Sequence, residues 1–216
     1  FASILLIIAA ATATLYFSPA TLLTTVLFAE RQMAGFSERE VQVGNVNIHY
    51  YEGGPADGET VLLVHGFGAN KDNWLQFSRT LTRNYHVIAL DLPGFGDSSK
   101  DPDAGYGLNV QTQRLAAFVK QLGLSQVNIV GNSMGGHIAA LYAARYPQTV
   151  RSLALFANAG ITSPQPSELQ QIIARGDANP LLVNNAADFN RLMDFVFVKP
   201  PAMPASLKQL MAERSI

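Results

Sequence analysis

Short apolar runs alternate with longer segments of helical spacing between residues 60 and 160, and this alternation predicts the order of elements. Continuous apolar runs of four to five residues are typical of strands buried on both faces of a parallel sheet. The alternation implies right-handed crossover units. The expected strands are Thr60–Val64, His86–Leu90, Val127–Val130 and Ser152–Phe156, and the expected helices are Trp74–Leu81, Val110–Leu122 and Met134–Arg145.

Two earlier runs predict how the sheet begins. Val41–Val43 and Val46–Tyr51 are separated by Gly44 and Asn45, which are turn residues that favour a hairpin. The sheet is therefore expected to be mainly parallel with an antiparallel start. Together these elements predict an α/β core over residues 30–159.

The sequence changes in character from about Gly160. Six prolines break residues 160–216 into short pieces with apolar patches between them, which favours an incomplete helical cap or lid inserted after a sheet strand. The alternative is an irregular C-terminal region packed on the core. Asp177, Asp188 and Asp194 fall in this segment, and we expect them to be solvated.

Residues 1–29 carry no charged side chain and form the most hydrophobic part of the chain. About 20 apolar residues suffice to span a bilayer as a helix, so this segment is long enough even with Pro19 within it. We expect a single N-terminal membrane anchor. Ala11-Thr12-Ala13 resembles a processing site, so a cleaved signal and a secreted or periplasmic protein remain open, as does an amphipathic or buried helix.

Ser133 is the strongest candidate for a catalytic residue. It lies in Gly131-Asn132-Ser133-Met134-Gly135, directly after an expected strand and directly before an expected helix, which is the setting of a nucleophile elbow. The strand must reverse into the helix within a residue or two, and bulky side chains at Gly131 and Gly135 would collide there. The free N–H groups of the new helix would stabilise negative charge near the serine oxygen.

A second motif, His65-Gly66-Phe67-Gly68, follows the Thr60–Val64 strand. In elbow hydrolases the loop after this strand supplies one oxyanion-hole N–H, and the residue after the serine supplies the other. We therefore assign these donors to Phe67 and Met134. His65 is expected to hold the loop shape with Gly66 and Gly68, and Asp91 is expected to brace the neighbouring loop.

The sequence shows no general base or acid in the expected places. His49, His86 and His137 are interpreted as structural or solvated, and no carboxylate follows the Ser152–Phe156 strand. The order in elbow folds is serine, then acid, then histidine. We therefore expect both partners beyond Ile216, and we expect residues 1–216 alone to be poorly active.

Composition excludes several other classes of protein. The 15 basic and 16 acidic residues give a net charge of −1, which argues against a nucleic-acid partner. The chain has no cysteine, so disulfides and a cysteine nucleophile are excluded, and it has no metal-binding motif. No Gly-x-Gly-x-x-Gly opens a helix after the first strand, and we expect no cofactor.

The motifs together resemble the α/β-hydrolase superfamily, and more narrowly bacterial family V lipases and membrane-anchored monoacylglycerol lipases. The resemblance rests on HGFGANKDNW at residues 65–74, DLPGFG at 91–96 and GNSMGG at 131–136. It implies that residues 30–159 are the N-terminal part of an α/β-hydrolase core, of which the later strands are missing from this sequence. It also implies hydrolysis of carboxylic esters with Ser133 as nucleophile, and a hydrophobic N-terminal anchor. A serine rather than an aspartate at the elbow argues against the dehalogenases and epoxide hydrolases that share the loop motifs.

The leading hypothesis is a serine esterase or lipase that acts on lipid-like esters through an acyl-enzyme. Another serine α/β hydrolase, such as a carbon–carbon bond hydrolase, a thioesterase or a perhydrolase, would keep the same elbow. A non-catalytic binding protein with this fold is the third alternative, favoured by the missing base.

Overall fold

The structure, a computed structural model, describes residues 18–161 and 164–215. Contacts divide the chain into two compact units, one formed by Ala29–Ile161 and the other by the flanking segments Phe1–Phe28 and Thr162–Ile216. We call Ala29–Ile161 the core unit and residues 164–215 the cap segment. The functional division at residues 1–29, 30–159 and 160–216 stays a prediction.

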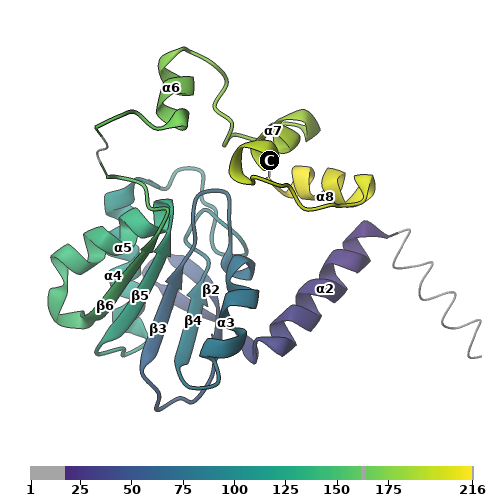
Figure 1. The fold of residues 1–216 in the computed structure, drawn as a ribbon. Helices are drawn as coiled ribbons and strands as arrows, with labels where there is room; N and C mark the ends of the chain where they lie inside the picture. The colour runs from purple at the N-terminus through teal and green to yellow at the C-terminus, as the bar shows by residue number, and fades with distance from the viewer. Residues whose placement is uncertain (1–17, 162–163, 216) are drawn as a thin grey trace, which may run out of the picture. The chain divides into compact units, whose positions relative to one another are not determined.

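The core unit is built on a six-stranded sheet in the order β1-β2-β4-β3-β5-β6 (Figure 1). The first two strands form an antiparallel hairpin, β2 is antiparallel to β4, and the remaining pairs are parallel. This confirms the predicted mainly parallel sheet with an antiparallel start. The strands are β1 (Phe36–Val43), β2 (Val46–Gly53), β3 (Thr60–Val64), β4 (His86–Leu90), β5 (Val127–Asn132) and β6 (Val150–Phe156).

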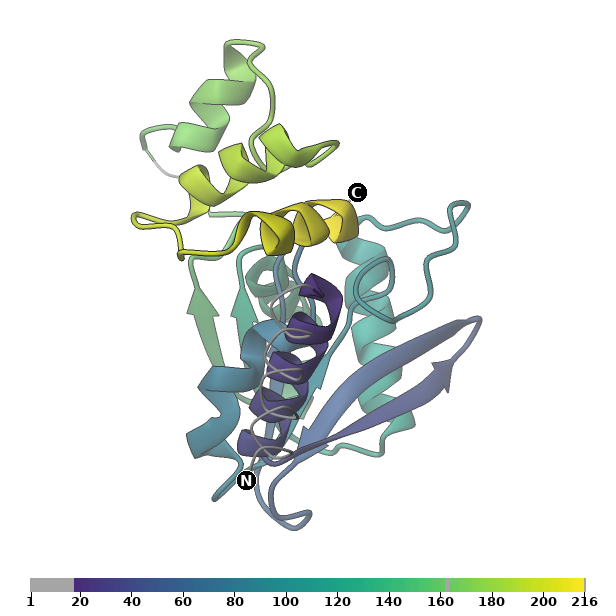
Figure 2. The same ribbon diagram turned by 90° about the vertical axis from the view of Figure 1, so that its right-hand side faces the viewer.

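Helices lie on both faces of the sheet, with α3 and α4 on opposite sides (Figure 2). The crossover between β3 and β4 contains the short helix η1 and α3, whereas α4 precedes β5 and α5 follows it. Their bounds are η1 (Lys71–Trp74), α3 (Leu75–Leu81), α4 (Leu108–Gln121), α5 (Met134–Arg145) and η2 (Pro147–Thr149). The predicted helices are confirmed, with ends that differ by up to a few residues.

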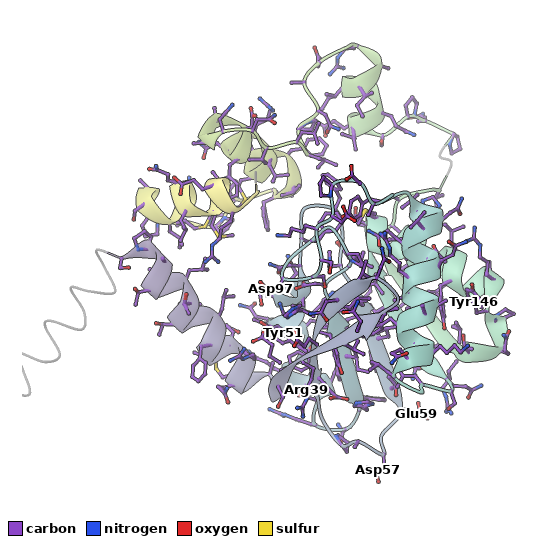
Figure 3. All side chains as sticks on the ribbon, turned by 180° about the vertical axis from the view of Figure 1, so that it is seen from behind. Arg39, Tyr51, Asp57, Glu59, Asp97 and Tyr146 are labelled. Carbon is purple, nitrogen blue, oxygen red and sulfur yellow. The ribbon has the colours of Figure 1, made fainter. Side chains whose placement is uncertain are left out.

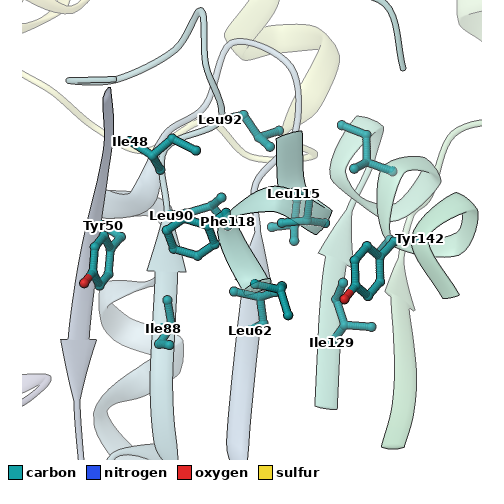
Figure 4. Close-up of a cluster of buried hydrophobic side chains, with 14 of the residues drawn as sticks. Ile48, Tyr50, Leu62, Ile88, Leu90, Leu92, Leu115, Phe118, Ile129 and Tyr142 are labelled. Carbon is teal, nitrogen blue, oxygen red and sulfur yellow. The ribbon is translucent and has the colours of Figure 1, made fainter. Parts of the chain in front are cut away.

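The main hydrophobic core lies between the sheet and the face formed by α4 and α5 (Figure 4). Because side chains alternate along a strand, Leu62, Ile88 and Ile129 point to this face, where they meet Phe118 and Tyr142. The intervening strand residues are buried as well, as expected for a parallel sheet covered on both sides. The core fixes the strand ends from which the candidate site is built.

β1 begins five residues before the predicted strand. Its first half, Phe36–Glu40, is mostly exposed and carries the polar residues Ser37, Glu38, Arg39 and Glu40. A strand at the edge of a sheet with its side chains in solvent needs no apolar pattern. The apolar pattern therefore predicted only the C-terminal end of β1, Val41–Val43.

The described residues of the cap segment form the short helices α6 (Glu168–Ala174), α7 (Ala186–Val196) and α8 (Ala205–Ser215). Ser167 and Asn185 cap the N-termini of α6 and α7 with their side chains. The expectation that Asp188 is solvated is wrong. Its carboxylate is buried and accepts hydrogen bonds from Asn184 and Arg191, because the turn before α7 folds back over it.

An N-terminal helix, α2 (Pro19–Met33), precedes β1 and has no buried residue. Within residues 18–161 and 164–215, no helix is both long enough and apolar enough to cross a membrane. The predicted anchor covers residues 1–29, and residues 1–17 lie outside the described part of the chain.

Candidate active site

Ser133 occupies the sharp corner between β5 and α5. Its backbone has φ 53° and ψ −117°, a left-handed conformation that is costly for any residue with a Cβ. The backbone N–H donates to the carbonyl of Phe156 at 2.9 Å, and the carbonyl accepts from Ala159 at 3.0 Å. The serine side chain forms no capping hydrogen bond with α5, so its hydroxyl is not used to begin the helix.

Glycines next to Ser133 allow the corner to form. A Cβ at Gly131 would lie 2.5 Å from the carbonyl oxygen of Gly135, and a Cβ at Gly135 would lie 2.3 Å from the carbonyl oxygens of Val64 and His65. Real side chains do not approach backbone so closely, so both positions require glycine. α5 therefore begins in direct contact with the end of β3.

The loop after β3 lies beside the corner. A Cβ at Gly66 would come within 3.1 Å of the Ser133 Cβ, which places this loop against the serine. Among the described residues, neither the N–H of Phe67 nor that of Met134 has a hydrogen-bond acceptor. The structure thus brings Ser133, the Gly66–Gly68 loop and the start of α5 together, and it leaves two backbone donors available there.

Aromatic rings line this loop. The side chain of Phe67 is 49% exposed and contacts Phe95 edge to face at 5.8 Å, and Phe95 contacts the His65 ring in the same way at 5.4 Å. Phe156, whose carbonyl accepts the Ser133 N–H, contacts Phe77 at 5.9 Å. The Gly66–Gly68 loop and the end of β6, which both adjoin Ser133, therefore each carry an exposed aromatic ring.

His65 is buried and both of its ring nitrogens are engaged by backbone groups. Nε2 accepts the N–H of Leu92 at 2.9 Å, so the proton lies on Nδ1, which donates to the carbonyl of Gly66 at 2.8 Å. Burial lowers the pKa of His65, which keeps the ring neutral. This arrangement joins the loop after β3 to the loop after β4 and leaves no ring nitrogen for a substrate proton.

The other histidines lie elsewhere. His49 contacts Glu40 within the β1–β2 hairpin, and His86 bonds Glu52 and Thr60 at the opposite end of the strands. His137 follows Ser133 by one turn of α5, and its ring lies against Gly160. In the part of the chain that the structure describes, no side chain forms a hydrogen bond with the Ser133 hydroxyl.

Two residues important for this region had no role assigned from the sequence. The side chain of Asn132 donates to the Phe156 carbonyl at 3.2 Å and so helps to hold the end of β6 beside Ser133. Lys71 is fully buried against Asp91. In the sequence, only its position within the motif at residues 65–74 could have indicated that it is important. Within the described ranges, no group of three or more histidine or acidic side chains could hold a metal ion.

The fold and the corner at Ser133 define the class of protein. The sequence matches the profile of the alpha/beta hydrolase fold family over residues 59–205, which is more than half of its length. The chain therefore belongs to the α/β-hydrolase family.

Within this family, the chain is similar to several lipases. The chain is 44% identical to Lipase 1 of Psychrobacter immobilis over 169 residues, which cover 77% of this chain and 52% of the lipase. It is 33% identical to monoacylglycerol lipase abhd6-B of Xenopus laevis over 195 residues, which cover 85% of this chain and 58% of that protein. The chain thus spans about half the length of the curated relatives it matches.

A solved structure of a membrane phospholipase A, described as a bacterial virulence factor, is also similar. It is 54% identical in sequence with a TM-score of 0.88, and the match covers 99% of this chain and 68% of that chain. These comparisons confirm the resemblance to bacterial lipases and monoacylglycerol lipases that the motifs indicated.

Proposed function

We propose that the full-length protein is a serine hydrolase that cleaves carboxylic esters of lipid-like substrates. One observation carries the proposal: Ser133 is held at φ 53° between the Gly66–Gly68 loop and the start of α5, and the backbone N–H groups of Phe67 and Met134 in these two segments have no acceptor in the described chain. Strain of this kind persists where surrounding structure imposes it, and it is concentrated at functional sites. The lipases and the phospholipase among the relatives support an ester of a fatty acid as the substrate.

In the proposed mechanism the Ser133 Oγ attacks the acyl carbon while a base accepts its proton, and the carbonyl oxygen becomes an oxyanion between the two N–H groups. The tetrahedral intermediate collapses, the alcohol leaves with the proton returned by the base, and water hydrolyses the acyl-enzyme by the same sequence. His65 is unsuited to be this base because both of its nitrogens bond backbone. We propose that a histidine and its acid come from residues outside those described here.

The exposed aromatic rings support an apolar acyl chain. Phe67, Phe77 and Phe156 all keep a large part of their surface exposed near the corner. An acyl chain that covers these rings would remove apolar surface from water, which is worth about 25 cal/mol per Å².

The proposal predicts that Ser133→Ala in the full-length protein lowers ester turnover by about three to six orders of magnitude, because the nucleophile and its base act as a unit. Turnover of p-nitrophenyl esters of increasing chain length, a phospholipid and a monoacylglycerol would be measured for the wild type and the variant. A thioester and a vinylogous diketone in the same panel test the thioesterase and carbon–carbon hydrolase alternatives.

Ser125→Ala is the matched control, because Ser125 is an exposed serine in the turn before β5, on the same stretch of chain. It should retain full turnover. Turnover of esters by Ser133→Ala at the wild-type rate would exclude Ser133 as the nucleophile, and inactivity of the wild type on the whole panel would favour a binding protein.

We further propose that the protein associates with a membrane through residues 1–29. Support comes from the absence of charge in this segment and from the membrane phospholipase A among the relatives. The full-length protein should stay in the membrane pellet after an alkaline carbonate wash, whereas its release into the supernatant would contradict an integral anchor.

A further inference from the structure

Lys71 is a buried cation with no part in the mechanism above. Its side chain is 2% exposed, and its Nζ lies 2.8 Å from Oδ2 of Asp91, a carboxylate with no exposed surface. Nζ also bonds the Asp97 carboxylate and lies 5.1 Å from the ring centre of Tyr51. Figure 3 labels Tyr51 and Asp97, two of the residues that the Lys71 amine contacts.

The amine remains charged in this position. Burial alone would lower the pKa of Lys71, but the attraction of Asp91 and the hydrogen bonds that the amine donates to Asp91 and Asp97 outweigh burial and raise the pKa above its ordinary value. An ion pair of this kind gives little net stability, because the cost of removing two charges from water offsets their attraction. A well-packed apolar pair would stabilise the fold equally well. The Lys71–Asp91 pair is therefore better explained by the segments of chain that it connects.

The Asp91 carboxylate ties two loops together. Oδ1 accepts the backbone N–H of Lys71 at 2.6 Å, and Oδ2 accepts the backbone N–H of Asp97 at 2.9 Å as well as the Lys71 amine. A Cβ at Gly96 would lie 2.2 Å from this carboxylate, so the loop after β4 closes tightly over it. The Asp91 carboxylate thus accepts hydrogen bonds from the end of the loop after β3 and from the loop after β4.

The loop that carries Phe67 is attached at both of its ends to consecutive residues. At its start, His65 accepts the N–H of Leu92, and at its end, Lys71 binds Asp91 through its backbone and its amine. Phe67 lies between these two attachments. Any displacement of Lys71 relative to Asp91 therefore moves the segment that presents the Phe67 N–H to Ser133.

We infer that Lys71 is a positioning residue, which holds the Phe67 N–H in place for the oxyanion by clamping its loop to Asp91. The inference rests on the proposed function, because it concerns the same oxyanion hole. It goes beyond the proposed function because it states that Lys71, with Asp91 and Asp97, keeps an N–H group of the oxyanion hole in position. The clamp acts on the transition state, where the oxyanion exists, and not on the binding of substrate in its ground state.

The test is Lys71→Met in the full-length protein, which keeps the length and packing of the side chain and removes its charge. We expect kcat for ester hydrolysis to fall about 10- to 100-fold, less than the loss of an oxyanion donor itself, with KM changed by less than about 2-fold. The affinity of a trifluoromethyl ketone, which forms an oxyanion on the serine, should fall by the same factor as kcat/KM.

Tyr142→Phe is the matched control for loss of a buried polar contact. Tyr142 is as buried as Lys71 and bonds Thr149 at 2.8 Å, on α5 and η2 away from the loop. This variant should lower the unfolding temperature without changing kcat or the affinity for the ketone. Wild-type kcat and ketone affinity in folded Lys71→Met would overturn the inference, even if its unfolding temperature fell.

If Lys71→Met does not fold, Asp97→Asn tests the positioning role of Lys71 instead. The Asp97 side chain is largely exposed, and its replacement removes only the second carboxylate from the amine. We expect a fall in kcat of about 2- to 5-fold with unchanged KM, and an unchanged kcat would overturn the inference. If Ser133→Ala is inactive while both variants match the wild type, only the inference fails, whereas an active Ser133→Ala refutes the proposed function itself.

Discussion

Ser133 combines a proposed role as nucleophile with a conformation that is unfavourable for its residue type. Holding a residue with a Cβ in the left-handed region costs about 1 to 3 kcal/mol, and the corner is imposed by contacts of its backbone with Phe156 and Ala159. The protein therefore gives up stability at this residue, whose hydroxyl makes no capping hydrogen bond with the helix that it begins.

This trade-off predicts that Ser133→Gly is more stable than Ser133→Ala by about 1 kcal/mol, because glycine relieves the strain and alanine retains it. Urea unfolding of the two variants measures the difference. At Ser125, which has no positive φ, glycine should instead be less stable than alanine by about 0.5 to 1 kcal/mol. The same order at both positions would show that the corner is unstrained.

At this scale the sharp corner at residues 131–135 could be predicted from the sequence, whereas the Lys71–Asp91 ion pair could not. The catalytic role of Ser133 stays a prediction. Gly131 and Gly135 can be interpreted locally, because the elbow is formed by consecutive residues. The burial of Lys71 against Asp91 depends on the pairing of β3 with β4, which brings positions 71 and 91 together from 20 residues apart. A lysine in a loop is normally solvated, so its residue type pointed away from its actual burial.

Among the elements, strands with continuous apolar runs were predicted almost to the residue. β3 and β4 begin and end where expected, since their residues are buried on both faces. The polar edge strand β1 was predicted only at its end, and the cap helices were predicted only as a class. Short helices such as α6 depend on capping by Ser167 and on packing, and neither leaves a long periodic pattern.

His65 joins the ends of β3 and β4, and its neutrality makes this junction sensitive to acid. The pKa of His65 in the folded state is lowered by burial, whereas in the unfolded chain it is about 6.5. The contribution of the neutral ring to stability is therefore fully present above about pH 6.5 and is lost as the pH falls below it, because only the unfolded chain binds the proton readily.

We expect the free energy of unfolding of the wild type to fall more steeply between pH 7.5 and pH 5 than that of His65→Gln, which has no titrating ring. Urea unfolding of both proteins at the two pH values measures this difference in slope. Parallel pH dependences would contradict a neutral, buried His65.

For the whole molecule, the strand order of the sheet, the corner at Ser133 and the family match all indicate an α/β hydrolase. The predicted α/β-hydrolase fold is confirmed by the strand order and by the family match over residues 59–205. No described side chain forms a hydrogen bond with the Ser133 hydroxyl, and the histidine and acid of the proposed triad stay a proposal. Membrane attachment through residues 1–29 stays a proposal.

The most direct test of the central claim is covalent labelling of the full-length protein with a fluorophosphonate, followed by fragmentation of the tryptic peptide 121–145. This peptide contains both Ser125 and Ser133, so the fragments must locate the adduct. We expect a single adduct on Ser133 and none in Ser133→Ala. An unlabelled wild-type protein, or an adduct on another serine, would contradict it.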